Sequence, residues 1–119
     1  MKRIEGDQEV AENGARQTNV PYQMELIDPY AILTLGAVLK KGADKYGVDN
    51  WRGIPSDEHL GRAIQHLYLH KYGDISEPHL ANAFTRCMMA LATQHAEVLM
   101  RVREGDQRDA RGTVRSQAG

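Results

Sequence analysis

The sequence has few of the features that mark secreted, membrane-spanning or nucleic-acid-binding proteins. It contains one cysteine in 119 residues, so no disulfide can form within the chain, as is typical of cytoplasmic proteins. No run approaches the ~20 apolar residues of a membrane helix. The opening residues, MKRIEGDQEV, lack the apolar centre of a signal peptide. The formal net charge is −1, which disfavours nucleic acid as a partner. These absences predict a cytoplasmic, single-domain protein.

Composition divides the chain into three regions. Residues 1–20 are polar, follow neither a helical nor a strand period, and predict a flexible arm with no hairpin signal. Residues 21–105 hold the apolar, periodic segments and predict one domain. Residues 106–119 are charged or small and predict a disordered tail.

Three segments have the apolar spacing of amphipathic helices, at about 29–41, 57–72 and 77–104. Asp28 precedes a proline and predicts the start of the first helix, because proline suits the first helical turn. Gly42 predicts the end of that helix. The sequence therefore predicts an all-α fold, a small bundle with three main helices.

The second and third of these helices carry long apolar stripes. In the second helix the stripe is Leu60, Ala63, Ile64 and Leu67, and in the third it is Leu80, Phe84, Cys87, Leu91, Val98 and Val102. Cys87 is expected to be a small buried hydrophobe on this stripe. A third helix of about 28 residues would be ~42 Å long, more than its shorter neighbours can cover. We therefore expect a homo-oligomer formed through the long C-terminal helix.

The segment 42–51, GADKYGVDNW, holds more special side chains than a simple connection needs. Here Tyr46 or Trp51 could stack on a nucleotide base. Lys45, Arg62 and Arg86 could bind phosphate oxygens. The alternatives are that the tryptophan is only a core plug, and that Arg86 pairs with an acidic residue across an interface.

A second cluster is expected where the second helix meets the third. The short connection at 73–76 brings His66 near Asp74, Glu77 and His79. Imidazole and carboxylate groups are ligands for divalent metals. Each residue also has an ordinary interpretation, either as a hydrogen-bonded histidine or as a carboxylate that favours a helix N-terminus.

Three runs resemble a known family. They are DPYAILTLGAVLKKGADKYGVDNW from Asp28, GRAIQHL from Gly61 and GDISEPHLANAF from Gly73. Together they are similar to the phage dATP/dGTP diphosphohydrolases, which are grouped with the MazG-like all-α nucleotide pyrophosphohydrolases. The resemblance covers about half of the chain, and its most specific part is the Gly-Ala-x-Lys-Tyr-Gly loop with its Asn-Trp end.

The resemblance implies Mg²⁺- or Mn²⁺-dependent hydrolysis of a nucleoside triphosphate, dATP or dGTP, to monophosphate and pyrophosphate. It implies a catalytic set of His66, Asp74 and His79, and a metal set of Asp74, Glu77 and His79. The implied substrate-binding set is Lys45, Tyr46, Asn50, Trp51, Arg62, Asn82 and Arg86.

The chain departs from the family pattern at several positions. Gln65, Asn82 and Arg86 stand where arginine, histidine and asparagine are common in the family. The Glu-x-x-Glu metal pattern of MazG-like enzymes is absent. These departures keep a second hypothesis open, a non-catalytic helical phage module that binds a nucleotide or a protein.

Overall fold

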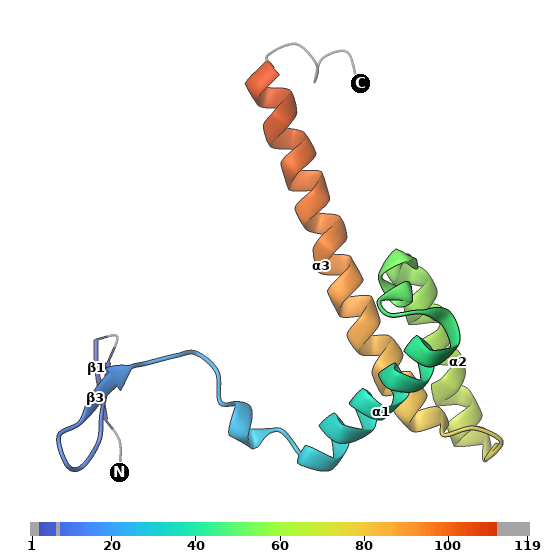
Figure 1. The fold of residues 1–119 in the computed structure, drawn as a ribbon, viewed down its shortest axis with the longest axis horizontal. Coiled ribbons are helices and arrows are strands. Elements are labelled where there is room, and N and C mark those ends of the chain that lie inside the picture. Colours follow the sequence, from blue (N-terminus) through green and yellow to red (C-terminus); the bar gives the residue numbers. More distant parts are fainter. Residues whose placement is uncertain (1–2, 7, 112–119) are drawn as a thin grey trace. The chain divides into compact units, whose positions relative to one another are not determined.

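The computed structural model describes residues 3–6 and 8–111. The chain divides into two compact units, Met1–Ile32 and Leu33–Gly119, and each is described here by itself. Helices dominate the described residues, which confirms the predicted all-α class (Figure 1). None of the helices in this part of the chain is long and apolar enough to cross a membrane.

The first unit contains a small antiparallel sheet. Its strands are β1 (Arg3–Glu5), β2 (Gln8–Val10) and β3 (Arg16–Thr18), in that order across the sheet. In this register Val10 stands opposite both Arg3 and Arg16, and its side chain is buried. A short 3₁₀ turn, η1 (Met24–Leu26), follows. The prediction of a flexible arm at 1–20 is therefore wrong for the described part of that segment.

The signal for this sheet was the dipeptide Asn13-Gly14. Gly14 has a φ of +87°, a conformation that favours glycine in hairpin turns. The Asn13 side chain accepts a hydrogen bond from the Ala15 N–H at 3.0 Å. Ala11 N–H in turn donates to the Ala15 carbonyl at 2.9 Å. The strands have only three residues each, too short to show an alternating pattern, so the turn was the one local indication of a sheet.

Helix α1 (Pro29–Tyr46) is longer than predicted. Asp28 accepts a hydrogen bond from the Ala31 N–H at 3.0 Å, which confirms it as the capping residue. Gly42 does not end the helix. The end falls at Gly47, whose φ of +99° is the left-handed conformation of a helix C-terminus. The helix therefore includes the first five residues of the GADKYGVDNW segment.

Helix α2 (Ser56–Tyr72) follows a 3₁₀ turn, η2 (Asn50–Gly53). Gly73, at φ +98°, ends α2 as predicted. At the start of α2, the N–H and hydroxyl of Ser56 donate to the two carboxylate oxygens of Glu97, at 3.1 and 2.8 Å. A glutamate of the next helix thus caps α2.

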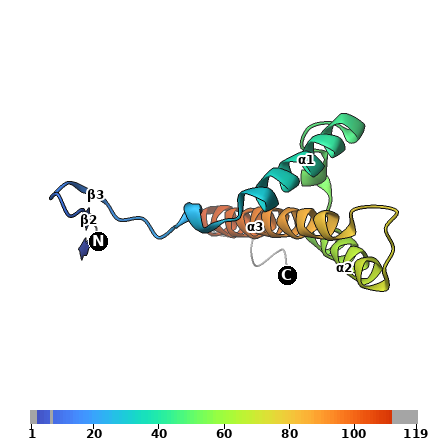
Figure 2. The same ribbon diagram turned by 90° about the horizontal axis from the view of Figure 1, so that it is seen from below.

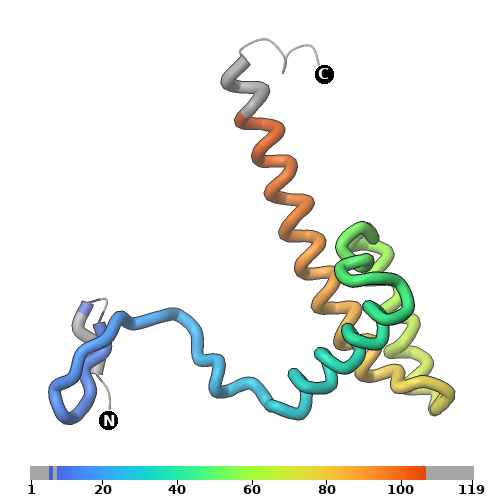
Figure 3. The backbone as a smooth tube through the Cα atoms, in the orientation of Figure 1, coloured from blue at the N-terminus to red at the C-terminus, as the bar shows by residue number. Residues whose placement is uncertain are grey.

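Helix α3 (His79–Arg111) is the longest element, and its 33 residues correspond to ~50 Å. It begins two residues later than predicted and continues through Gly105, so the predicted disordered tail is wrong for residues 106–111. Residues 112–119 lie outside the described part of the chain. The backbone trace shows α3 extending well beyond the end of its contact with α2 (Figure 3).

Helices α2 and α3 form the main packing contact of the second unit. They run antiparallel, since Ser56 meets Glu97 at one end and His66 meets His79 at the other. Helix α1 begins near α3 and runs away from it at an angle in the second view (Figure 2).

The buried residues described in α2 and α3 are small or polar. They are His59, Ala63, His79, Ala83, Thr85 and Thr93. The predicted apolar stripes, apart from Ala63, remain exposed in the single chain. Cys87 is also exposed, so the expectation that it is buried is wrong for the chain taken alone.

Candidate functional site

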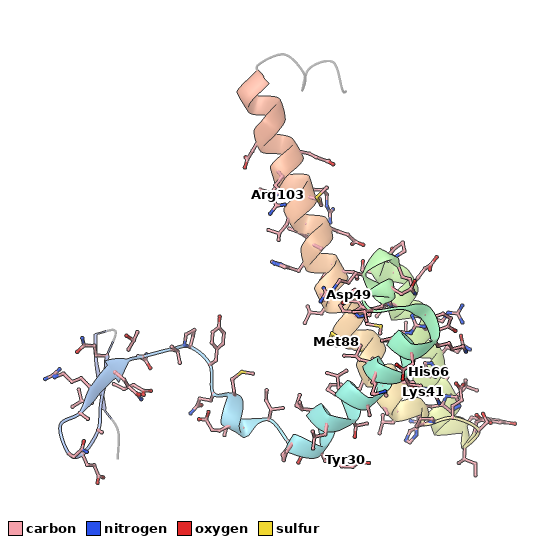
Figure 4. The ribbon with its side chains drawn as sticks, viewed as in Figure 1. Tyr30, Lys41, Asp49, His66, Met88 and Arg103 are labelled. Carbon is pink, nitrogen blue, oxygen red and sulfur yellow. The ribbon has the colours of Figure 1, made fainter. Side chains whose placement is uncertain are left out.

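The antiparallel contact brings His66 of α2 against His79 of α3. Their Nδ1 atoms are 2.9 Å apart, and the ring centroids are 5.2 Å apart at a tilt of 39°. Figure 4 labels His66 on α2. The sequence predicted that these two histidines would come within reach of each other, and the structure places them in direct contact.

Asp74 holds His79 from its other side. One carboxylate oxygen accepts hydrogen bonds from the His79 Nε2 and the Ser76 hydroxyl, both at 2.5 Å. The bond from Ser76, followed by the bond from His79, holds the pKa of Asp74 below its ordinary value. The carboxylate therefore stays ionised and can only accept, so Nε2 of His79 carries the hydrogen. In the neutral ring, this leaves the Nδ1 lone pair directed at His66.

His66 is biased toward its neutral form. Burial is the largest effect on its pKa and lowers it, and the nearby positive charges of Arg86 and Arg62 lower it further. Glu77 acts in the opposite direction. Neutral imidazole is the form that binds metal ions. In the hydrogen bond between the two rings the His66 Nδ1–H donates to the Nδ1 of His79, so a metal held by both Nδ1 atoms would replace this hydrogen bond.

Glu77 completes a set of three donors with His66 and His79. One ligand atom from each residue lies within 4.8 Å of the other two. Metal bonds to imidazole nitrogen and carboxylate oxygen are ~2.0–2.2 Å, so two ligands of one ion lie at most ~4.4 Å apart. Glu77 is exposed and free to close the small difference. The donor set therefore fits a divalent ion.

The predicted metal set was Asp74, Glu77 and His79, whereas the donors that converge are His66, Glu77 and His79. The Asp74 carboxylate instead contacts the far nitrogen of His79. This is the usual position of a carboxylate that orients a metal-binding histidine. Direct ligation by Asp74 stays a prediction.

Two arginines lie beside the histidine pair. Burial and the charge of Arg62 lower the pKa of Arg86, while Tyr46 acts to raise it. Arg62, Arg86 and Tyr46 are thus close enough to interact electrostatically. Guanidinium groups in a partly buried position are suited to binding phosphate oxygens. The structure therefore brings two of the predicted substrate-binding residues, Arg62 and Arg86, near His66, with Tyr46 near Arg86.

His59 is a site residue that the sequence reasoning missed. It is fully buried, and its Nε2 lies 2.8 Å from the carbonyl oxygen of Trp51. A carbonyl can only accept, so Nε2 carries the hydrogen and Nδ1 accepts from the Arg86 guanidinium at 3.0 Å. One imidazole thereby joins the Trp51 loop to Arg86. The available signal was the seven-residue spacing to His66, which places both on one helix face.

The GADKYGVDNW segment lies beside His59 and Arg86. Asp49 adopts a left-handed φ of +62° and its carboxylate accepts from Arg52 at 3.0 Å. The Arg52 guanidinium lies 4.3 Å from the centre of the Trp51 ring. Trp51 is half-buried, with its edge toward His59 at 6.3 Å between centroids. The tryptophan therefore packs within the loop structure, which leaves its stacking on a base as a prediction.

The remaining predicted substrate residues are placed less specifically. Lys45 is exposed with its ammonium 5.1 Å from the Tyr46 ring centre. Asn50 is exposed at the start of η2, and Asn82 is half-buried on α3. Their contacts with a substrate stay predictions.

The chain was compared with known proteins. No curated protein and no solved structure matches it. A family model described as dATP/dGTP diphosphohydrolase, N-terminal, matches residues 11–103. This span includes every residue of the site and most of the chain, in agreement with the resemblance carried by the loop and the two helices. The chain belongs to the dATP/dGTP diphosphohydrolase N-terminal family.

Proposed function

We propose that this chain hydrolyses a nucleoside triphosphate, dATP or dGTP, to the monophosphate and pyrophosphate, with Mg²⁺ or Mn²⁺ as cofactor. The observation that supports this most is the convergence of His66, Glu77 and His79 beside Arg62 and Arg86. A divalent ion and a triphosphate need these two kinds of group next to each other. The base specificity rests on the family description alone.

In the reaction, the oxygen of a water attacks the α-phosphorus, and the bond to the α–β bridging oxygen breaks. The products are the nucleoside monophosphate and pyrophosphate, and the proton lost by the water passes to the solvent. A divalent ion held by His66, Glu77 and His79 would supply charge neutralisation and a more acidic bound water.

The chain's own residues have separate parts in this scheme. Asp74 holds the His79 ring in one tautomer and one orientation. Arg62 and Arg86 bind phosphate oxygens and balance their charge. Tyr46, Asn50 and Trp51 shape the wall of the substrate pocket, with Lys45 and Asn82 at its border. We place this activity in the cytoplasm of a phage-infected bacterium, in keeping with the phage proteins that the sequence resembles.

The test is a hydrolysis panel of dNTPs and NTPs with Mg²⁺ or Mn²⁺ and product analysis. We expect pyrophosphate and monophosphate, formed fastest from dATP or dGTP. Glu77→Gln should abolish most of this activity, and Glu104→Gln, which changes an exposed carboxylate elsewhere on α3, should not. Inorganic triphosphate with free nucleoside would contradict the proposed bond cleavage.

The second hypothesis, a non-catalytic module that binds a nucleotide or a protein, is favoured by the missing Glu-x-x-Glu pattern. Thermal unfolding with dGTP, in the presence and absence of Mn²⁺, separates the two. Stabilisation that requires both ligands supports the enzyme, because ligands that bind the native state together raise its melting temperature. Absence of turnover from every nucleotide in the panel would support the module.

A further inference from the structure

Trp51 is the only tryptophan of the chain, and its ring has an interior neighbour and an exposed one. The interior neighbour is the His59 ring, at 6.3 Å between centroids and 70° between ring planes. His59 is fully buried. The exposed neighbour is Arg52, whose guanidinium lies over the tryptophan ring at 4.3 Å from its centre. Arg52 therefore covers the ring from the solvent side.

Asp49 holds Arg52 in this position. The Arg52 Nε donates to the Asp49 carboxylate at 3.0 Å, and the Arg52 backbone N–H donates to the Asp49 carbonyl, also at 3.0 Å. Asp49 has a left-handed φ of +62°, which aspartate and asparagine adopt more readily than most residues. The 3₁₀ turn η2 follows at once. The anchor, the ring and its cover thus lie within four consecutive residues.

The contacts that hold Arg52 over the ring are weak. The side chains of Arg52 and Asp49 are 60% and 61% exposed, and exposed ion pairs contribute little to stability because water and salt screen them. A cation over an aromatic ring at an exposed site is also only weakly attracted. A nucleotide base stacks on an aromatic ring more strongly than this. A flat base can therefore replace the guanidinium on the Trp51 ring.

One imidazole connects Trp51 to the arginines of the candidate site. His59 donates to the Trp51 carbonyl at 2.8 Å and accepts from the Arg86 guanidinium at 3.0 Å. Arg86 and Arg62 both lie close enough to His66 to affect its pKa. The order of ring, imidazole and guanidinium thus matches the order of base, sugar and phosphates in a nucleotide. A nucleotide with its phosphates on the arginines has its base on the side of Trp51.

A displaced Arg52 side chain has another place to go. Arg52 also lines a groove of about 810 Å³ between the η2 turn and α3. The carboxylates of Asp57 and Glu97 belong to the same groove. Glu97 accepts two hydrogen bonds from Ser56, whereas Asp57 is exposed in the first turn of α2. The groove therefore offers the guanidinium a second carboxylate when it leaves the ring.

We propose that Arg52 occupies, in the free chain, the place that the nucleotide base takes on the Trp51 ring, and that it leaves the ring when a nucleotide binds. This inference rests on the proposed function, because it needs a nucleotide as the ligand. Arg52 competes with the base and leaves the phosphate contacts unchanged. The same competition acts on the nucleoside monophosphate after pyrophosphate has left, so the return of Arg52 to the ring favours release of that product.

The test compares the binding of two ligands to the full-length protein by isothermal titration calorimetry in one Mg²⁺ buffer. The first is a dGTP analogue with a methylene group in place of the α–β bridging oxygen, so the proposed bond cleavage cannot occur. The second is inorganic triphosphate, which has no base. Fluorescence of Trp51, the only tryptophan, is recorded in parallel. We expect the analogue to quench this emission and the triphosphate to leave it unchanged.

Two variants weaken the cover without removing the ring. Arg52→Lys keeps the charge but replaces the flat guanidinium by a strongly hydrated ammonium, so the ratio of analogue affinity to triphosphate affinity should rise by at least about threefold. Asp49→Asn removes the anchoring charge and keeps a residue that tolerates a left-handed φ, so the same ratio should rise. Arg103→Lys, at an exposed arginine on α3 (Figure 4), is the control and should leave the ratio unchanged.

The possible results separate this inference from the proposed function. An unchanged ratio in Arg52→Lys would overturn the inference, and a lower ratio would show that Arg52 stacks on the base instead of giving way to it. Binding of the analogue with no change in Trp51 emission would also overturn the inference, while the proposed function would stand. Failure of both ligands to bind would overturn the two together.

Discussion

The residues of α2 and α3 that face each other are small or polar, whereas the large apolar residues of both helices face outward. In an ordinary helical core the large apolar residues face inward. The buried residues described in the two helices are two histidines, two alanines and two threonines. The leucines and the phenylalanine stand outside, one residue further along each helix. The comparison teaches that the intramolecular contact brings polar groups such as His66 and His79 together, while most of the large apolar side chains stay exposed in the single chain. The predictions that follow test the inward face, from the largest expected effect to the smallest.

Asp74→Asn should give the largest change in activity. The substitution keeps the size of the side chain but removes the charge that orients His79 and favours its Nε2–H tautomer. Loss of such a supporting carboxylate typically lowers metal affinity or activity by about 10–100-fold. Asp57→Asn, an exposed carboxylate in the first turn of α2, serves as the control. If a folded Asp74→Asn protein hydrolyses dGTP at the parental rate, Asp74 has no role in the site.

Ala83→Leu should give the largest change in stability. Ala83 is 2% exposed on α3, and the added methyl groups of a leucine have no room at a buried position. Overpacking of this kind costs about 1–3 kcal/mol in free energy of unfolding. Chemical denaturation of this variant and of Ala96→Leu, at an exposed position on the same helix, measures the effect. Equal stability of the two variants would show that the inward face is not tightly packed.

His59→Gln tests the connection between the Trp51 loop and Arg86. Glutamine cannot donate to the Trp51 carbonyl and accept from Arg86 in the same geometry, so we expect a loss of about 1–2 kcal/mol in stability. Because Arg86 would lose its orientation, KM for dGTP should rise more than kcat falls. His95→Gln, at an exposed position on α3, is the control. A stability loss with no change in KM would reduce His59 to a structural role.

Glu97 should give the smallest effect, seen as a change in the pH dependence of stability. Hydrogen bonds from the Ser56 N–H and hydroxyl lower the pKa of Glu97. A carboxyl with a lower pKa in the folded state stabilises the protein above its unfolded pKa of ~4.3. That contribution is lost as the pH falls through the folded pKa. Free energies of unfolding measured toward acidic pH should therefore decline less steeply in Glu97→Gln than in the wild type, and identical slopes would exclude this capping contribution.

Much of the helical framework could be predicted from local sequence, because its boundary signals act locally. Asp28 caps α1 and Gly73 ends α2, as expected from their chemistry. Gly42 was predicted to end the first helix. That prediction is wrong, because glycine lowers helix propensity only modestly and the helix could continue to Gly47. The third helix likewise continues past its predicted end at 104. In the N-terminal unit, the Asn13-Gly14 turn was a readable signal for a hairpin that the polar composition obscured.

The site was predicted in part. The chain turn after Gly73 places α3 beside α2, so the proximity of His66 and His79 followed from sequence and connectivity. His59 was missed because its partners are a backbone carbonyl and an arginine 27 residues away, and neither leaves a pattern in the sequence. The same holds for Asp74, whose contact with the far nitrogen of His79 depends on the path of the connecting loop.

The sequence by itself determined where helices form, which residues line each helix stripe, and which family motifs are present, because these depend on spacing and on local backbone chemistry. Only the tertiary structure decided which stripe faces inward. Helix periodicity defines an apolar stripe but does not say whether that stripe packs within the chain or against another molecule. In this protein the buried alanines Ala63 and Ala83 and the hydrogen bonds that His66, His59 and Ser56 of α2 make with α3 go with a rotation of the two helices that leaves the leucines outside.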